Sequence, residues 1–178
     1  FRLASARTDM RVVAINDLAD SETMAYLLAY DTAYGRFARP VGASPEGLVI
    51  DGVLIPCFQK KDPAELPWKE LHVDVVLECT GIFRDRVGAQ KHLDAGAKKV
   101  IISAPAKGND VESFVFGVNE QSYADQNIID NASCTTNCAA PVMRVLSEHF
   151  GVEKALLSTT HSYTASQNLQ DGYAKDIR

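Results

Sequence analysis

The stretch 73-VDVVLECTGIFRDRVGAQKHLDAGAKKVIISAP-105 contains two apolar runs separated by a more polar segment. The runs at 73–80 and 99–105 are rich in valine and isoleucine and almost continuously apolar, as strands covered on both faces are. The segment between them predicts a helix from Asp85 to Ala95, with Gly96 as its C-terminal stop. A strand, a helix and a second strand in this order predict a parallel pair joined by a crossover helix.

Outward from this unit, short β-branched runs alternate with helical stretches along the chain. Further strands are predicted at 11–17, 113–119, 127–130 and 154–164. The stretch 20–31 predicts a helix with Asp20 or Ser21 as its N-cap. The segment 35–62 is punctuated by glycine and proline around short strand-like pieces, which indicates an antiparallel excursion. We therefore predict an α/β fold built on a parallel sheet.

Composition and charge limit the kinds of molecule that we expect the protein to bind. The 178 residues are 46% hydrophobic and 23% charged, which is typical of a globular protein rather than a disordered or fibrous one. The net charge of −5 and the scattered Lys and Arg predict no nucleic-acid or anionic-membrane partner. No apolar run approaches the roughly 20 residues that span a bilayer. We expect a small-molecule partner and a cytoplasmic location.

Both ends of the sequence indicate a fragment. Residues 1–7 resemble the end of a helix, without an initiator Met and without the strand and cap that usually precede one. The last residues, 175–178, belong to no complete element. We therefore expect a chain that is incomplete at its start and at its end.

Polar residues follow several of the predicted strands, where parallel sheets bind ligands. Asp17 follows the first strand and could accept hydrogen bonds from an adenosine ribose while repelling a 2′-phosphate. It could equally be a helix cap or a turn residue. Thr80 and Ser103 follow the next two strands, and Thr80 could likewise belong only to a turn. A glycine-rich phosphate loop, the stronger dinucleotide signal, is absent from these residues.

The stretch 131-NASCTTNCAAP-141 places Cys134 and Cys138 four residues apart. Metal ligation, a disulfide, burial and nucleophilic catalysis would each explain these thiols. An amphipathic helix follows, with an apolar face of Val142, Val145, Leu146 and Phe150. Cys134 therefore lies at or just before a helix N-terminus, where free backbone N–H groups and the helix dipole stabilise a thiolate nucleophile.

His161 is the candidate base for this nucleophile. If the predicted strand 154–164 returns beside the helix, it would bring the His161 imidazole to the Cys134 sulfur. A structural histidine near a strand end is the alternative. Zinc is the weaker hypothesis, because two cysteines and one histidine lack a fourth ligand.

The remaining thiols have ordinary explanations. Cys57 and Cys79 lie in apolar contexts, so we expect them to be buried and inert. Cys138 lies one helical turn beyond Cys134, and we expect it to be packed.

The motif at 131–138 resembles the active-site signature of phosphorylating glyceraldehyde-3-phosphate dehydrogenases, and this motif is highly specific. The resemblance covers essentially the whole chain. Its other matching segments, in family order, are 14–18, 27–31 with 35–37, 78–81, 102–105 and 161–164.

The resemblance implies a Rossmann-type NAD-binding domain over residues 1–133, incomplete at its start, and the beginning of an α+β catalytic domain over 134–178. It implies that Cys134 is the nucleophile and His161 its base. Asp17 matches the adenosine-ribose acceptor, Thr80, Phe83 and Ser103 match cofactor-pocket residues, and Lys61 stands at a cofactor position where the family often has Arg. Ser133, Thr135 and Thr164 match positions that hold phosphate groups. No metal site is implied.

The implied reaction is the NAD-dependent oxidation and phosphorylation of glyceraldehyde 3-phosphate to 1,3-bisphosphoglycerate through a cysteine thiohemiacetal and thioester. The partners would be this aldehyde and inorganic phosphate, and the complete protein would be a homotetramer. Asn16-Asp17 and Ser162-Tyr163-Thr164 favour the glyceraldehyde enzyme over the related erythrose-4-phosphate dehydrogenase. A non-catalytic fragment or partner protein is the alternative from a different functional class.

Overall fold

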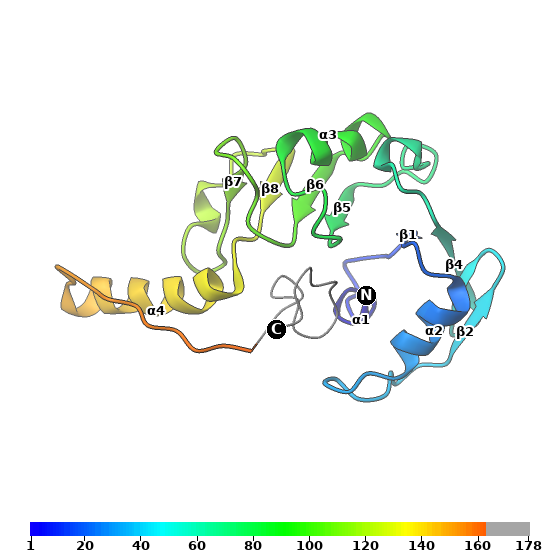
Figure 1. Cartoon of the computed structure of the whole chain (residues 1–178), viewed down its shortest axis with the longest axis horizontal. Helices are drawn as coiled ribbons and strands as arrows, with labels where there is room; N and C mark the ends of the chain where they lie inside the picture. Colours follow the sequence, from blue (N-terminus) through cyan, green and yellow to red (C-terminus); the bar gives the residue numbers. More distant parts are fainter. Residues whose placement is uncertain (163–178) are drawn as a thin grey trace, which may run out of the picture.

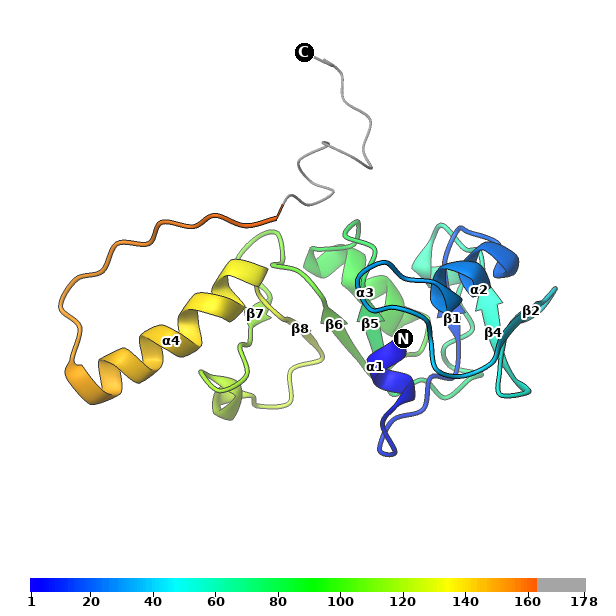
Figure 2. The same cartoon turned by 90° about the horizontal axis from the view of Figure 1, so that it is seen from below.

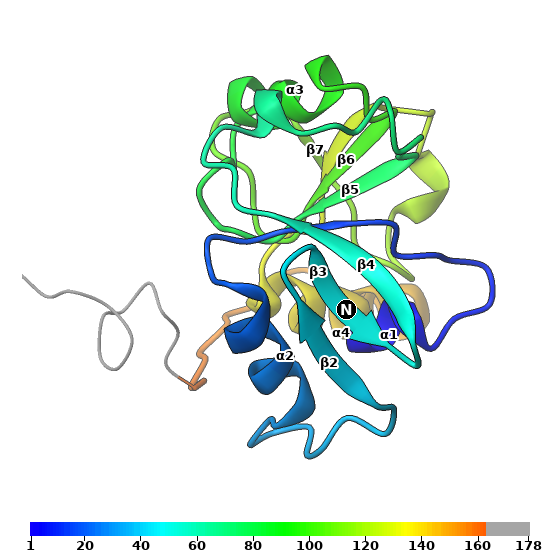
Figure 3. The same cartoon turned by 90° about the vertical axis from the view of Figure 1, so that its right-hand side faces the viewer.

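The computed structural model describes residues 1–162 and contains two four-stranded sheets (Figures 1 and 3). The predicted unit forms as β5 (Val75–Glu78), α3 (Arg86–Asp94) and β6 (Lys99–Ile102), and β5 pairs with β6 in parallel. The Asp85 carboxylate caps α3 by accepting a 2.7 Å hydrogen bond from the Gly88 N–H. Gly96 follows α3 with a φ of +107°, and a Cβ there would lie 2.4 Å from the Lys69 Cβ. The α/β prediction for this stretch is confirmed.

One face of this sheet packs under α3 and forms the main core. Val76, Val100 and Ile102 alternate with outward-facing residues, so they reach the same side of the pleat. They pack there with Ala89 of α3 and with Trp68, and both Val100 and Ala89 are completely buried. Burying these apolar side chains is the main stabilising contribution to the unit.

Further along the chain, β8 (Ile128–Asp130) pairs in parallel with β6, and β7 (Glu112–Ser113) pairs in parallel with β8. The order in this sheet is therefore β5-β6-β8-β7. Because β5, β6 and β8 are parallel neighbours, their carboxyl ends lie at one edge of the sheet. The residues that follow these strands start from this edge.

The other sheet has the order β1-β4-β3-β2. Its strands are β1 (Ile15–Asn16), β2 (Val41–Ser44), β3 (Gly47–Ile50) and β4 (Val53–Phe58). The antiparallel ladders β2–β3 and β3–β4 confirm the predicted antiparallel excursion, while β1 pairs with β4 in parallel. The helix α2 (Ser21–Ala29) packs on this sheet, and the Asp20 carboxylate caps it as predicted.

The remaining elements are α1 (Arg2–Ser5), the 3-10 helices η1 (Pro63–Glu65) and η2 (Glu120–Ser122), and α4 (Cys134–Phe150). Figures 1 and 2 show α4 extending away from the sheets, and none of its residues is buried. Residues 151–162 then run back beside α4 (Figure 2).

Three predictions of secondary structure were wrong in detail. Only Glu112 and Ser113 are extended in the region of the predicted strand 113–119, because the chain turns from Phe116 onward. The described part of the predicted strand 154–164 is irregular, because no strand edge within residues 1–162 pairs with it. The strand predicted at 11–17 is reduced to β1 and belongs to a different sheet from β5 and β6, because its pairing partner is β4.

Candidate active site

Two predicted cofactor residues lie side by side at the carboxyl edge of the β5-β6-β8-β7 sheet. Thr80 follows β5, Ser103 follows β6, and both side chains are exposed. The Ser103 backbone N–H donates a 3.0 Å hydrogen bond to the Glu78 carbonyl, which continues the parallel ladder past the end of β6. The structure therefore places two hydroxyl groups where open parallel sheets bind ligands.

A buried carboxylate holds the turn that carries Thr80. Glu78 is only 3% exposed, and its Oε1 accepts a 2.7 Å hydrogen bond from the Thr80 backbone N–H and another from the Thr80 hydroxyl. The Thr80 Oγ1 in turn accepts a hydrogen bond from the Ile82 N–H at 3.1 Å. Burial acts to raise the pKa of Glu78, but the donors on His92 and Thr80 outweigh it and hold this pKa below its ordinary value.

A second buried carboxylate shapes the loop that leads to the cysteine motif. Asp130 ends β8 and is 2% exposed, and its Oδ1 accepts a 2.7 Å hydrogen bond from the Ala132 N–H. Its Oδ2 accepts from the Ala106 N–H at 3.0 Å and from the Ser113 hydroxyl at 2.9 Å. Ala132 has a φ of +54°, a left-handed conformation that is uncommon for a residue with a side chain. The Asp130 bond to its backbone stabilises this strained turn directly before the motif.

Cys134 is the first residue of α4, and its side chain is exposed. Ser133 caps the helix, since its Oγ accepts a 3.0 Å hydrogen bond from the Thr136 N–H. The Asn137 side chain donates to the Asn131 carbonyl at 2.6 Å and to the Ser133 carbonyl at 3.0 Å, which closes the loop onto the first turn. The predicted position of Cys134 at a helix N-terminus is confirmed.

The other residues predicted to bind phosphate have different surroundings. The Ser133 hydroxyl is already engaged, with its Oγ 2.8 Å from the Thr136 Oγ1 as well as capping α4. Thr135 lies in the first turn of α4 and is half-buried. Thr164 lies outside the described residues.

Asp17 and Lys61 lie at neighbouring strand ends of the other sheet. The Asp17 N–H donates a 3.0 Å hydrogen bond to the Phe58 carbonyl, and its exposed carboxylate accepts one from the Ala19 N–H at 2.9 Å. Asn16 bridges β1 to the chain after β4, through reciprocal hydrogen bonds of 2.9 and 3.0 Å with the Lys60 backbone. Lys61, the next residue, is exposed.

The structure does not bring His161 into a hydrogen bond with Cys134 among the contacts of residues 1–162. His161 is exposed, and its Nδ1 lies 2.7 Å from the carbonyl of the adjacent Ser162. It belongs to the irregular segment after α4 rather than to a strand. The pairing of the imidazole with the thiol stays a prediction.

Two predictions about thiols were wrong. Cys79 is exposed because it alternates with the buried Glu78, as the exposed Val75 and Leu77 of β5 do, and Cys138 is exposed on α4, in which no residue is buried. Cys57 is half-buried, and burial raises the pKa of its thiol. All of these thiols and Cys134 are free, and the described residues contain no cluster of three or more side chains suited to a metal ion.

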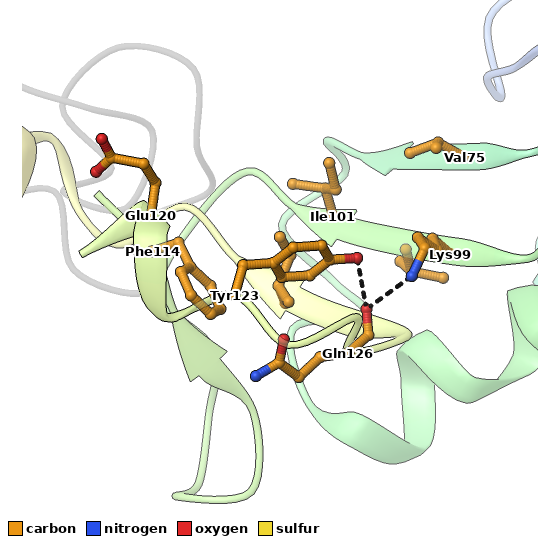
Figure 4. A pocket seen from close by; sticks show the side chains of 9 residues that line it. Val75, Lys99, Ile101, Phe114, Glu120, Tyr123 and Gln126 are labelled. Carbon is orange, nitrogen blue, oxygen red and sulfur yellow. Dashed lines mark hydrogen bonds between the residues drawn. The ribbon is translucent and has the colours of Figure 1, made fainter. Parts of the chain in front are cut away.

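An apolar hollow lies at the other end of the same sheet (Figure 4). Its lining includes Val75 and Lys99, which begin β5 and β6, together with Ile101. The Tyr123 hydroxyl and the Lys99 ammonium both donate to the Gln126 carbonyl, at 3.3 and 3.4 Å (Figure 4). This hollow is therefore separate from the strand ends that carry Thr80 and Ser103. In the part of the chain that the structure describes, no helix is both long and apolar enough to cross a membrane.

Sequence reasoning missed the residues that support the site from inside. Glu78, His92 and Asp130 are the buried polar and charged side chains among the described residues. The available signal was an acidic residue closing an apolar strand run, as Glu78 closes VVLE and Asp130 closes IID. An ionisable side chain at such a position is buried with its backbone and must find donors.

Comparison with known proteins gives one consistent family. Residues 1–86 match the family model described as glyceraldehyde 3-phosphate dehydrogenase, NAD binding domain, and residues 133–178 match the one described as glyceraldehyde 3-phosphate dehydrogenase, C-terminal domain. A glyceraldehyde-3-phosphate dehydrogenase of Serratia odorifera is 50% identical over 179 residues, which cover 100% of this chain and 60% of that protein. Glyceraldehyde-3-phosphate dehydrogenase 2 of Streptomyces avermitilis is 49% identical over 172 residues, covering 96% of this chain and 51% of that protein.

A chloroplastic glyceraldehyde-3-phosphate dehydrogenase of Gracilaria gracilis is 48% identical over 181 residues, covering 99% of this chain and 44% of that protein. The chain thus spans about half the length of the relatives it matches. The family models and the relatives agree with the cysteine motif and with NAD as the predicted cofactor. The chain belongs to the glyceraldehyde-3-phosphate dehydrogenase family.

Proposed function

We propose that the protein catalyses the NAD-dependent oxidation and phosphorylation of glyceraldehyde 3-phosphate to 1,3-bisphosphoglycerate. The observation that carries this proposal is the position of Cys134. Its thiol is exposed at the N-terminus of α4, and α4 begins from the same sheet edge as Thr80 and Ser103. A nucleophile beside a ligand-binding strand edge is the arrangement that covalent aldehyde chemistry requires.

The residues at the strand ends fit NAD. Asp17 presents an exposed carboxylate after β1, suited to the adenosine ribose, and the exposed residues Thr80 and Ser103 follow β5 and β6. Phe83 and Lys61 are the further cofactor contacts that we propose. We place the end of the cofactor domain at residue 133, directly before Cys134. NAD, when bound, supplies the acceptor for the hydride that leaves the substrate carbon.

The chain's own residues carry the covalent chemistry. The Cys134 sulfur forms a bond to the aldehyde carbon, and the thiol proton passes to His161. His161 delivers this proton to the aldehyde oxygen, which gives the thiohemiacetal hydroxyl. His161 then takes the hydroxyl proton back as the hydride departs and the carbon–oxygen double bond re-forms, which leaves a thioester, and the proton passes from His161 to solvent. A phosphate oxygen attacks the thioester carbon, the carbon–sulfur bond breaks, and the Cys134 thiolate is regenerated. Thr135 and Thr164, with Ser133 once its cap bond opens, are the proposed phosphate contacts.

The test is an assay of the protein expressed from its full coding sequence. We expect reduction of NAD that requires both glyceraldehyde 3-phosphate and either phosphate or arsenate, with slower turnover of erythrose 4-phosphate and of NADP. NAD reduction without phosphate or arsenate would contradict the phosphorylating reaction, and preference for erythrose 4-phosphate would reassign the substrate.

Alkylation tests the nucleophile and base without relying on turnover. Limited iodoacetamide treatment followed by peptide mass mapping should modify Cys134 before the exposed Cys79 and Cys138. His161→Asn should slow this modification at neutral pH, because the imidazole no longer takes the thiol proton. An unchanged rate would remove His161 from the surroundings of Cys134.

The family also leads us to propose a homotetramer, with the aldehyde and inorganic phosphate as the small-molecule partners. A cytoplasmic location stays a prediction, because relatives described as chloroplastic appear beside those without that description.

A further inference from the structure

A chain of buried polar side chains runs beneath the strand ends of the β5-β6-β8-β7 sheet. Trp68, His92 and Glu78 are 5%, 4% and 3% exposed, and they come from the turn after η1, from α3 and from the end of β5. The Trp68 Nε1–H donates a 3.0 Å hydrogen bond to the His92 Nδ1, and the His92 Nε2 lies 2.9 Å from the Glu78 Oε2. The indole and imidazole rings also lie nearly parallel, with an interplanar angle of 19°.

These contacts determine which ring nitrogen of His92 carries the proton. An indole nitrogen can only donate, so the His92 Nδ1 facing Trp68 must be the unprotonated acceptor. The ring proton is therefore on Nε2, which donates to the Glu78 carboxylate. A second proton on Nδ1 would point directly at the indole N–H. The arrangement thus directs the His92 Nε2–H at a carboxylate that is itself buried and hydrogen-bonded.

Both carboxylate oxygens of Glu78 accept hydrogen bonds, one from His92 and the other from Thr80. The Oε2 accepts from His92, while the Oε1 accepts from the Thr80 backbone N–H and hydroxyl. Thr80 itself is exposed at the strand edge. The His92 and Phe83 rings also make an edge-to-face contact, with ring centroids 6.4 Å apart. Both cofactor residues of the turn after β5 therefore rest on the same buried chain.

The other end of the chain reaches the second group of cofactor residues. The Trp68 ring makes an edge-to-face contact with Phe58, the last residue of β4, at 6.2 Å between centroids. The Phe58 carbonyl accepts the hydrogen bond from the Asp17 N–H. Contacts thus run without interruption from the residue after β1 to the turn after β5, although these strands belong to different sheets.

We propose that Trp68, His92 and Glu78 are positioning residues that hold the turn from Thr80 to Phe83 in the geometry that NAD requires. The inference rests on the proposed function, because it assumes that this turn contacts NAD. Its physical basis is that a buried carboxylate with every donor in place has one low-energy arrangement, and that arrangement also orients Thr80.

Glu78→Gln is the main test. A glutamine side chain has one carbonyl oxygen and one amide nitrogen, so it can accept from His92 or from Thr80 but not from both. We expect the dissociation constant for NAD, measured by calorimetry, to rise about tenfold, as for the loss of one charge-assisted hydrogen bond. The rate of Cys134 alkylation without NAD should change by less than about twofold, because α4 makes no hydrogen bond to Trp68, His92 or Glu78. Exposed Glu70→Gln is the matched control and should leave NAD affinity unchanged.

A double-mutant cycle separates positioning from general loosening. If Glu78 acts through Thr80, adding Glu78→Gln to Thr80→Val should weaken NAD binding by no more than about twofold beyond the weaker-binding single variant. Combined with Ser103→Ala, the effects of Glu78→Gln should instead multiply, because Ser103 makes no bond to the Glu78 carboxylate. Multiplicative effects with Thr80→Val would overturn the inference.

Replacements of His92 decide the question if Glu78→Gln does not fold. In His92→Gln an amide can still accept from Trp68 and donate to Glu78, whereas His92→Leu keeps the volume but leaves Glu78 without that donor. NAD affinity should be retained within about threefold in His92→Gln and fall about tenfold in His92→Leu. Nitrogen NMR of His92 should show the proton on Nε2 in the native protein.

The outcomes distinguish this inference from the proposed function. Suppose that the native protein binds NAD and that folded Glu78→Gln or His92→Leu binds it equally well. The buried residues Trp68, His92 and Glu78 then have only a structural role, and the inference fails while the proposed function stands. If the native protein does not bind NAD, the proposed function fails and the positioning role fails with it.

Discussion

The strand ends of the β5-β6-β8-β7 sheet and the segment 152–162 both carry proposed catalytic or cofactor residues, but they are held very differently. At the strand ends, the turn that contains Thr80 and the turn before Cys134 are each bonded to a carboxylate that is at most 3% exposed. In the segment 152–162 the Leu156 side chain is 103% exposed, and the hydrogen bond of His161 goes to its own neighbour.

The difference shows that exposed site residues can be positioned from below. Thr80 is itself exposed, yet Glu78 and His92 beneath it leave little freedom to its turn. His161 has no corresponding support among the contacts of residues 1–162. The proposed approach of His161 to Cys134 therefore rests on none of the contacts of residues 1–162.

The largest expected effect is on turnover, and it tests the site at the carboxyl edge of the β5-β6-β8-β7 sheet. In the protein expressed from its full coding sequence, Cys134→Ser should lower kcat by at least about a thousandfold, because a hydroxyl at this position is a far weaker nucleophile. Cys138→Ser, one helical turn along, is the control and should retain turnover. Substantial activity in Cys134→Ser would remove this thiol from the mechanism. The measurement is the initial rate of NAD reduction.

Core truncation under the same edge should have the next largest effect, on stability. Ile102 ends β6 and is 1% exposed. Ile102→Ala should lower the free energy of unfolding by about 3 kcal/mol, through lost burial and the cavity left behind. Urea denaturation followed by circular dichroism would measure it. A loss below about 1 kcal/mol would mean that this edge is less well packed than its burial indicates.

Glu78→Gln should lower the free energy of unfolding by about 2 kcal/mol at pH 7, because the glutamine side chain can no longer accept hydrogen bonds from both His92 and Thr80. The pKa of Glu78 in the folded protein is below its ordinary value, so the carboxylate stabilises the fold above the unfolded-state pKa of about 4.3. That contribution disappears as the pH falls through the lowered folded-state pKa.

The stability difference between the native protein and Glu78→Gln should therefore be fully present above about pH 5 and shrink as the pH falls below about 4.3. Thermal unfolding measured across this pH range would check the sign. A difference that grows toward acid would contradict the assignment of an ionised, hydrogen-bonded Glu78.

The smallest effect is expected in the segment after α4. Leu156→Ala should change the free energy of unfolding by less than about 0.5 kcal/mol, because its side chain is fully exposed. This is the matched partner of Ile102→Ala, with an aliphatic side chain truncated in each region. A loss comparable to that of Ile102→Ala would show that the segment packs against the fold, and the contrast between the two regions would disappear.

Much of the fold was predictable from local pattern. The strand–helix–strand unit at 73–105, the cap at Asp20 and the antiparallel excursion all formed as expected, because apolar periodicity, caps and glycine stops act over a few residues. The short or missing strands failed for a different reason. A strand exists only where another strand offers it hydrogen bonds, and the residues 154–162 have β-compatible composition but no such edge.

The candidate site divides in the same way. The position of Cys134 at a helix N-terminus followed from sequence, because the motif and the helix are contiguous. The exposure of Cys79 and Cys138 did not, since it depends on which faces other elements cover. The Rossmann-type parallel sheet, the cysteine at its helix and the family were therefore determined by the sequence itself. The chain from Trp68 through His92 to Glu78 was decided only by the tertiary structure, because it joins residues 68, 92 and 78 through distance and burial that no local pattern encodes.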